Sequence, residues 1–315
     1  MSQPDKTYLL SLVVPCYNEM YTLPLFVQET LKVTSTLEDV ATEIILVDDG
    51  SKDETLKTMR QLKKEYPCIR YLSFSRNFGK EGAIIAGLAA SKGDWVAVMD
   101  ADLQDPPALL PAMLQGIREE GYDCVGTRRQ NRKGEPIIRS FFACLFYKFI
   151  NLISDIKLVE GARDYKLLSR KVVDALLSMP EVNRFSKGLY EWIGFRTKWL
   201  SYDNIERVAG KTKWSMWKLF KYSVEGIVSF STAPLMLSAL LGLFFMFISF
   251  VSITLLVVRQ ILFHNSVDGW TSMVCIVLMM GGVQLFCLGV FGQYMSKMYR
   301  EIKRRPNYII AEQED

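Results

Sequence analysis

Residues 8–19 read YLLSLVVPCYNE, a run of apolar residues that ends in a polar loop. A short apolar run of this kind, bounded by turn-forming residues, is typical of a buried strand. Similar runs follow it, separated by amphipathic stretches that indicate helices. Strands are expected at 8–15, 43–47, 69–74 and 95–99, with helices at 23–37 and 55–65 among others. This alternation predicts an α/β fold, with a mostly parallel sheet covered on both faces.

Polar and acidic loops follow three of these strands. Their sequences are PCYNE at 15–19, DDGS at 48–51 and DADLQD at 100–105. Open α/β sheets bind ligands beyond the carboxyl ends of their strands, where like charges repel unless a cation or a hydrogen-bonding ligand compensates them. Carboxylate oxygens suit Mg²⁺ or Mn²⁺, and Mg²⁺ usually combines one or two carboxylates with substrate phosphates. The pattern therefore predicts a site for a metal-bound diphosphate.

Composition and missing motifs exclude several classes of protein. Half of the 315 residues are hydrophobic, which excludes a disordered chain, and six cysteines without a CxxC pair indicate a reduced setting rather than a disulfide-stapled module. No GxxxxGK[ST] loop, GxGxxG loop after a strand, or GxSxG elbow occurs. The only histidine is His264, so histidine acid–base chemistry is not expected. No nucleic-acid partner is expected either.

Two long uncharged runs predict a membrane domain. Residues 233–258 and 271–296 contain no charged side chain, and each is long enough for a helix to cross a hydrocarbon core of about 30 Å. Lysines and arginines precede the first run and follow the second, so the positive-inside rule places both ends in the cytoplasm. The N-terminus lacks the layout of a signal peptide, which fits a cytoplasmic start. The expected location is the cell membrane.

Two further segments are predicted to lie in the headgroup region. The first is an apolar segment near 137–154 that carries two basic residues, and the second is 214–231, which is rich in aromatic and lysine residues. An ordinary core helix is the alternative for each. The predicted division is a catalytic domain at 1–210, an amphipathic helix at 211–232, two spans within 233–296 and a basic cytoplasmic tail at 297–315. Glycines at 281, 282, 289 and 292 would permit close packing with a second copy.

Longer motifs resemble one family. VVPCYNE, ILVDDGSKDET, MDADLQDPP and the pair of C-terminal spans resemble the polyisoprenyl-phosphate glycosyltransferases, which are GT-A-fold members of glycosyltransferase family 2 and include bactoprenol glucosyltransferases and dolichol-phosphate mannose synthases. The resemblance covers nearly the whole chain. It implies metal-dependent transfer of a hexose from a UDP-sugar, UDP-glucose first, to undecaprenyl phosphate, with inversion at the anomeric carbon.

The resemblance also implies roles for individual residues. Asp102 resembles the principal metal ligand, with Asp100 beside it as a sugar or ribose contact and second ligand. Asp164 resembles the acidic group facing the anomeric centre, and Arg128 and Arg139 resemble the arginines for the acceptor phosphate. VEGARDYKLLSR departs from the family's commoner GDFRL, so Arg163 receives no role. The other expected nucleotide-sugar contacts are Pro15, Tyr17, Asn18, Glu19, Asp48, Asp49, Ser51, Gln104, Arg207, Lys211 and Lys213.

The acceptor chemistry favours positioning over strong base catalysis. A phosphomonoester is largely ionised near neutrality, because its second pKa is about 6. The protein must therefore mainly orient and neutralise two anions, and Asp164 either positions a substrate or removes the last proton. UDP-N-acetylglucosamine is the alternative donor. A processive polysaccharide synthase is disfavoured because the chain lacks a QxxRW motif and has only two expected spans. A non-catalytic membrane scaffold is the remaining alternative.

Overall fold

The computed structural model describes residues 8–129, 151, 159–202, 228, 231–263 and 269–314. Within these residues, the strands form one eight-stranded sheet in the order β7-β5-β6-β4-β1-β2-β3-β8. The predicted strands are confirmed to within a few residues at each end. The strands are β1 (Tyr8–Cys16), β2 (Val40–Asp48), β3 (Ile69–Phe74), β4 (Trp95–Val98), β5 (Cys124–Arg129), β6 (Ala162–Ser169), β7 (Thr197–Tyr202) and β8 (Ile310–Glu314).

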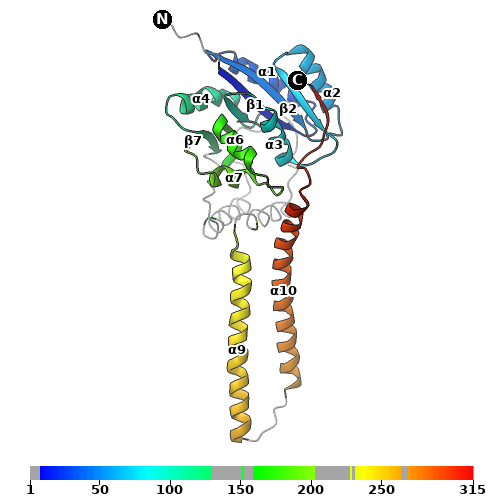
Figure 1. Cartoon of the computed structure of the whole chain (residues 1–315), viewed down its shortest axis with the longest axis vertical. Coiled ribbons are helices and arrows are strands. Elements are labelled where there is room, and N and C mark those ends of the chain that lie inside the picture. The colour runs from blue at the N-terminus through cyan, green and yellow to red at the C-terminus, as the bar shows by residue number, and fades with distance from the viewer. Residues whose placement is uncertain are drawn as a thin grey trace.

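Helices cover both faces of this sheet (Figure 1). One face carries α1 (Thr22–Thr34), α2 (Thr55–Glu65) and α4 (Leu110–Arg118), which follows the short helix η1 (Pro107–Leu109). The other carries α3 (Lys80–Ala90), α6 (Arg170–Ser178) and α7 (Ser186–Trp192). Because both faces are covered, the central strands β1, β2 and β4 are apolar on both sides, as their sequences predicted.

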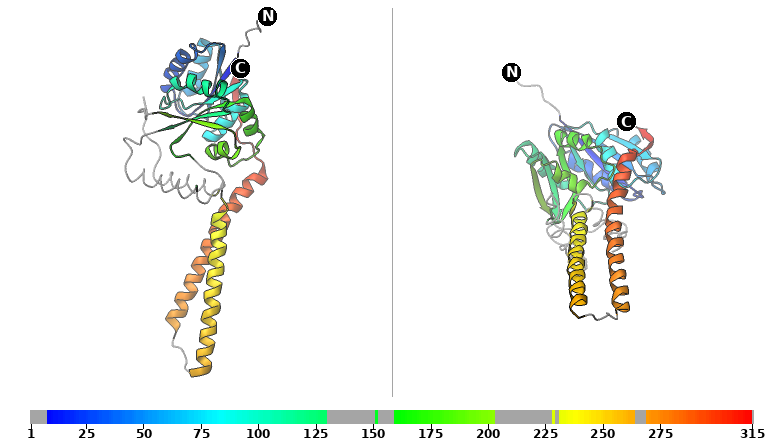
Figure 2. Two further views of the ribbon diagram at one scale, coloured as in Figure 1. Left: turned by 90° about the vertical axis from the view of Figure 1, so that its left-hand side faces the viewer. Right: turned by 60° about the horizontal axis from the view of Figure 1, so that its bottom comes forward.

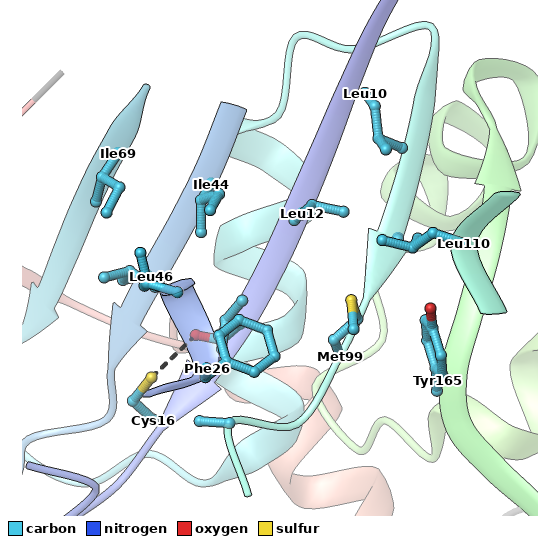
Figure 3. Packing of buried hydrophobic residues seen from close by; sticks show 14 of the residues in the cluster. Leu10, Leu12, Cys16, Phe26, Ile44, Leu46, Ile69, Met99, Leu110 and Tyr165 are labelled. Carbon is cyan, nitrogen blue, oxygen red and sulfur yellow. Dashed lines mark hydrogen bonds between the residues drawn. The ribbon is translucent and has the colours of Figure 1, made fainter. Parts of the chain in front are cut away.

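The main core lies beneath α1, α2 and α4. Figure 3 shows Leu12 of β1 and Leu46 of β2 in this cluster together with Phe26 of α1, and all three side chains are fully buried. On the opposite face, α3 approaches β1 closely at Gly87. A Cβ atom there would lie 2.2 Å from a methyl carbon of Val13, so only glycine permits this approach. The position of α3 matters because its first residues contribute to the site described below.

The sheet is mixed, which corrects the prediction of a mostly parallel sheet. Strand β1 pairs in parallel with β2 and β4, and β2 pairs in parallel with β3. Beyond β4, however, β6 runs antiparallel to both β4 and β5, while β5 and β7 are parallel to each other. The sequence of β6, ARDYKLLS, carries charged residues rather than the uniformly apolar run that marks a parallel strand. This antiparallel strand brings Asp164 next to the carboxyl end of β4.

Two long helices project together from the sheet domain (Figures 1 and 2). They are α9 (Ala233–Phe263) and α10 (Trp270–Lys303), and the Tyr294 hydroxyl of α10 donates a 2.6 Å hydrogen bond to the carbonyl oxygen of Ser231, just before α9. Among the described residues, only the Ala233–Ser252 part of α9 is long and apolar enough to count as a candidate membrane span. The second predicted span is not confirmed by this criterion. The predicted segments 137–154 and 214–231 lie outside the described residues, apart from single positions.

The C-terminal segment differs from the predicted basic tail. The last turns of α10 carry the basic residues, and the chain then returns to the sheet as β8, which pairs antiparallel with the edge strand β3. Arg60 of α2 donates two hydrogen bonds to the Glu312 carboxylate, at 2.8 and 2.5 Å. The Tyr71 hydroxyl of β3 lies 2.7 Å from the same carboxylate. Residues 310–314 form a strand because they cover the unpaired edge of β3.

Candidate active site

The candidate site lies where the sheet changes direction. The chain passes from β1 to β2 and β3 on one side of the sheet, and then returns to place β4 on the other side of β1. In open α/β sheets such a switch point opens a crevice at the carboxyl ends of the strands. The loops that start at Pro15, Asp48 and Asp100 therefore meet at one edge, as the sequence predicted.

Hydrogen bonds join the loops after β1 and β2. The backbone N–H of Asn18 donates to the Ser51 hydroxyl at 3.0 Å, and the Asn18 side-chain oxygen accepts from the backbone N–H of Lys52 at 2.8 Å. Glu19 donates its N–H to the Thr55 hydroxyl at 2.9 Å. Asn18 has φ of 57°, a left-handed conformation that asparagine tolerates better than most residues. These bonds hold the loop from Pro15 to Glu19, including the half-buried Tyr17, beside the loop after β2.

Asp48 and Asp49 are engaged within the protein itself. The Asp48 carboxylate accepts from the Ser51 N–H at 2.9 Å and from the Ser73 hydroxyl at 2.8 Å. The Asp49 carboxylate accepts from the backbone N–H groups of Phe78 at 2.6 Å and Gly79 at 3.0 Å, immediately before α3. Both aspartates are at least 96% buried, with exposures of 2% and 4%. These two predicted site residues therefore hold the loops and the start of α3 in place.

Asp100 and Asp164 are joined by one lysine. The Lys80 ammonium at the start of α3 lies 2.6 Å from Oδ1 and 2.9 Å from Oδ2 of Asp100, and it also contacts Oδ2 of Asp164. The ammonium of Lys187, in α7, lies 3.6 Å from Oδ1 of Asp164. The two carboxylates are 24% and 27% exposed, so solvent reaches both. The lysines thus join the end of β4 to the start of β6.

The two lysines keep Asp164 ionised. Burial alone would raise the pKa of this carboxyl, but attraction to Lys80 and then to Lys187 outweighs burial, so its pKa lies well below the ordinary value. The pKa of Lys80 is raised in turn, because its attraction to Asp100 and Asp164 exceeds the opposing effect of burial. The pKa of Asp100 is raised, because burial outweighs its attraction to Lys80. The carboxyl that the lysines hold ionised is therefore Asp164, beside the charged ammonium group of Lys80.

The DADLQD loop after β4 makes further polar contacts through Asp102 and Asp105. Asp102 accepts from the backbone N–H of Gln104 at 3.1 Å, and the intervening Leu103 has φ of 57°, a strained conformation for leucine. The next residue, Asp105, is fully buried; it accepts from Nε of Arg163 at 3.0 Å and from the Tyr202 hydroxyl. Arg163, which received no role from the sequence, thus anchors the loop that carries Asp102.

Arg128 and Arg129 point in different directions because successive strand residues face opposite sides of a sheet. Arg128 is exposed and donates from Nε to the Ser201 hydroxyl at 2.9 Å. Arg129 instead donates from Nη2 to the Gln104 side-chain oxygen at 3.2 Å. Within the described residues, the buried Nε of Arg129 has no hydrogen-bond partner. The structure therefore places Arg129 next to the DADLQD loop and Arg128 beside β7.

Four other predicted contacts fall outside the described residues: Arg139, Arg207, Lys211 and Lys213. Sequence reasoning missed Lys80, Lys187 and Arg129. Lys80 carries one usable signal, since it directly follows Gly79 at the start of an apolar helix and lies within RNFGKEG. Lys187 carries none, because its approach to Asp164 depends on how α7 packs against the sheet.

The donor set suits a metal that also binds substrate. Among the described residues, no three acidic, histidine or cysteine side chains gather closely enough to hold a metal ion without help. Mg²⁺ typically needs only one or two carboxylates when phosphates complete its shell. Asp100 is already neutralised by an ammonium group, which shows that a cation is favoured beside it. Asp100 and Asp102 therefore fit a divalent ion delivered with a diphosphate.

The chain is similar to known glycosyltransferases in sequence. Residues 11–177 match the family model described as Glycosyl transferase family 2. The putative glycosyltransferase CsbB of Bacillus subtilis (strain 168) is 44% identical over 307 residues, covering 98% of this chain and 92% of the relative. The bactoprenol glucosyl transferase of Shigella phage SfX is 40% identical over 301 residues, covering 96% and 98%.

A solved structure resembles the chain at the level of the fold. It is the mannosyltransferase PcManGT from Pyrobaculum calidifontis in complex with GDP-Man and Mn²⁺, with a TM-score of 0.50 and 15% sequence identity. The likeness covers 93% of this chain and 89% of the other. At this low identity the comparison concerns the fold alone.

Proposed function

Because the chain belongs to glycosyl transferase family 2 and has a GT-A fold, we propose that this glycosyltransferase transfers a hexose from a UDP-sugar to undecaprenyl phosphate. UDP-glucose is the first candidate donor, and inversion at the anomeric carbon is expected. Support for the acceptor comes from relatives named bactoprenol glucosyl transferase, which are 40% identical over nearly the whole chain. The product would be a polyprenyl-monophosphate sugar for cell-envelope glycosylation.

The observation that carries the proposal is the lysine-bridged pair of carboxylates at the switch point of the sheet. Asp100 and Asp102 would hold Mg²⁺ or Mn²⁺, which when bound would neutralise charge on the departing diphosphate. Gln104 would lie at the sugar end of the donor. The residues from Pro15 to Glu19, with Ser51, would bind the nucleotide directly, whereas Asp48 and Asp49 would act by holding that loop.

On the acceptor side, arginines and Asp164 have separate tasks. A guanidinium binds a phosphate through two parallel donors, which suits Arg128 and Arg139 to the acceptor phosphate. Arg129 joins them in this proposal because its buried Nε has no partner in the described part of the chain. Asp164, ionised between two lysines, would position the sugar or the acceptor rather than remove a proton. Arg207, Lys211 and Lys213 would close over the diphosphate.

The membrane arrangement completes the proposal. The catalytic domain (1–210) and both chain ends would be cytoplasmic, with interfacial segments near 137–154 and 211–232 and spans by α9 and α10. Support comes from the candidate span in α9 and from the exposed apolar side chains along both helices, such as Phe250 and Leu285. A lipid-linked phosphate lies at the membrane surface, so the two helices would hold the catalytic edge where the acceptor is found.

Purified full-length protein, given Mn²⁺ or Mg²⁺ and undecaprenyl phosphate, should release UDP from one donor in a panel of UDP-sugars. Glucose transfer is expected, and preference for UDP-N-acetylglucosamine would change the donor without changing the reaction. A long polysaccharide product would indicate a processive synthase. Absence of UDP release with every donor would favour a non-catalytic scaffold.

A further inference from the structure

A pocket of about 240 Å³ lies where the last turns of α10 meet the sheet domain, and neither of the lysine-bridged carboxylates lines it. Three segments far apart in the sequence form its walls. They are the start of α3 around Glu81, the loop 182–185 before α7, and the end of α10 with the following Asn307. Among the described residues, none of those expected to bind the sugar donor lines it.

Two carboxylates hold the walls of this pocket, and one of them, Glu81, is itself a lining residue. Glu301 of α10 accepts from the backbone N–H groups of Val182 at 3.0 Å and Asn183 at 2.9 Å. Glu81 accepts from the backbone N–H of Ser186 at 3.2 Å and from its hydroxyl. Both acidic groups therefore have donors within the protein. These hydrogen bonds preform the pocket, and Glu81 remains an acidic group in its lining.

Two basic side chains of α10 line the pocket. Lys297 and Arg300 are three residues apart, so they lie on the same side of the helix. Arg184 also lines the pocket, but its guanidinium donates to the carbonyl oxygens of Met179 at 2.8 Å and Leu176 at 3.0 Å. Lys297 and Arg300 thus give the opening a positive charge suited to a phosphate group.

Asn307 adds a requirement for a hydrogen-bond donor. Its side-chain N–H group donates to the carbonyl oxygen of Glu181 at 3.3 Å, which turns Oδ1 the other way. Oδ1 is buried and lacks a partner within the described residues. A buried acceptor without a donor is unfavourable, so a hydroxyl group on a bound molecule would complete it.

The outer surface of the same helix turns is apolar. Met298, Tyr299 and Ile302 are 49%, 57% and 71% exposed, beside the basic residues of the pocket. Tyrosine beside apolar and basic residues is characteristic of the membrane–water interface. A molecule with a phosphate group and hydrocarbon chains could bind the basic pocket through the phosphate and cover the apolar surface with its chains.

We propose that this pocket binds the headgroup of an anionic phospholipid with a hydroxylated headgroup, such as phosphatidylglycerol. Lys297 and Arg300 bind its phosphate, a headgroup hydroxyl donates to Oδ1 of Asn307, and the acyl chains lie along Met298 and Ile302. The inference rests on the membrane placement within the proposed function. Bound lipid would fix the end of α10 against α3, whose first residue, Lys80, bridges the two carboxylates.

Binding can be measured on the full chain in a neutral detergent. Dioctanoyl phosphatidylglycerol, dioctanoyl phosphatidylcholine and inorganic phosphate are titrated separately, with thermal stabilisation and native mass spectrometry as readouts. The phosphatidylglycerol should bind saturably and the other two more weakly. Arg300→Ala should weaken its binding about ten- to a hundredfold, since it removes a charge-assisted contact, while Arg300→Lys retains part of the affinity.

Arg305→Ala is the matched control, because Arg305 is a nearby exposed arginine outside the pocket. Unchanged lipid affinity in Arg300→Ala, or an equal loss in Arg305→Ala, would overturn the site. Equal binding of inorganic phosphate would indicate a free-anion site, and equal binding of phosphatidylcholine would show that the headgroup is not distinguished; either contradicts the proposal. UDP binding is followed in each variant and should not change, so failure of sugar transfer is separable from failure of this lipid site.

Discussion

Two acidic pairs at neighbouring strand ends have opposite environments. At the end of β2, Asp48 and Asp49 are buried and accept hydrogen bonds from backbone N–H groups and the Ser73 hydroxyl. At the end of β4 and near the start of β6, Asp100 and Asp164 are about a quarter exposed and contact lysine side chains. Backbone donors are fixed by the fold, whereas an ammonium on a flexible chain can be exchanged for another cation. The first pair supports the site, and the second is available to substrates.

The largest effect on activity should come from the exchangeable pair. Asp100→Asn removes a charge that would bind the divalent ion, so sugar transfer should fall by two to three powers of ten while the melting temperature stays close to that of the wild type. Transfer rates and thermal unfolding are measured on the same preparation. Asp102→Asn is the companion variant and should behave in the same way. Near-wild-type turnover in both variants would remove the metal-ligand assignment.

The fixed pair should show the opposite result. Asp49→Ala leaves the backbone N–H groups of Phe78 and Gly79 without their acceptor, which should lower the free energy of unfolding by about 2 to 4 kcal/mol. Asp49→Asn keeps one acceptor oxygen and should cost less. Unfolding is followed by circular dichroism in detergent. A variant as stable as the wild type that has lost UDP binding would show instead that Asp49 is a ligand contact.

Asp164→Asn tests positioning against base catalysis. The pKa of Asp164 lies below its ordinary value, so the carboxylate stabilises the folded state above about pH 4, and that contribution is lost as the pH falls further. Between pH 6 and 8 the group is a carboxylate throughout. Transfer should therefore slow about tenfold by the same factor at each pH in this range. A defect that disappears above the second pKa of the acceptor phosphate would instead indicate proton removal.

The smallest effect should come from a third acidic group at the surface. Arg60 holds the pKa of Glu312 at about 2, yet both side chains are substantially exposed. Exposed ion pairs contribute little to stability, so Arg60→Ala should lower the melting temperature only slightly and leave sugar transfer unchanged. If Arg60→Ala destabilised the protein as much as Asp49→Ala does, the kind of hydrogen-bond donor beside a carboxylate would not determine how much that contact stabilises the fold.

The sequence predicted one half of the sheet better than the other. Strands β1 to β4 are largely apolar because helices cover both of their faces, and such runs are visible without a structure. Strands β6 and β7 alternate apolar with charged or polar residues, and β8 is short and acidic. Their positions depend on contacts with distant strands, so local pattern could not place them.

The same limit applies to the site. Aspartates at strand ends were predictable, because the carboxyl ends of the strands meet wherever a sheet of this kind forms. The division into a fixed pair, Asp48 and Asp49, and an exchangeable pair, Asp100 and Asp164, was not predictable. It depends on the start of α3, where Gly79 contacts the loop after β2 and Lys80 contacts the loop after β4. The contact of Arg129 with the DADLQD loop was not predictable either, because it depends on the register of β5, and a shift by one residue would turn Arg128 to that side instead.

The pairing of β8 with β3 also sets an order of assembly. Tyr71 and Glu314 are partners across 243 residues, so β8 cannot cover this edge of β3 until residues 310–314 have left the ribosome. At a synthesis rate of about 5 to 20 residues per second, that interval is roughly 10 to 50 s. An uncovered strand edge is a template for aggregation, so chaperones would have most to protect during this interval. Because β8 follows α10, the sheet domain is completed only after both long helices have been made.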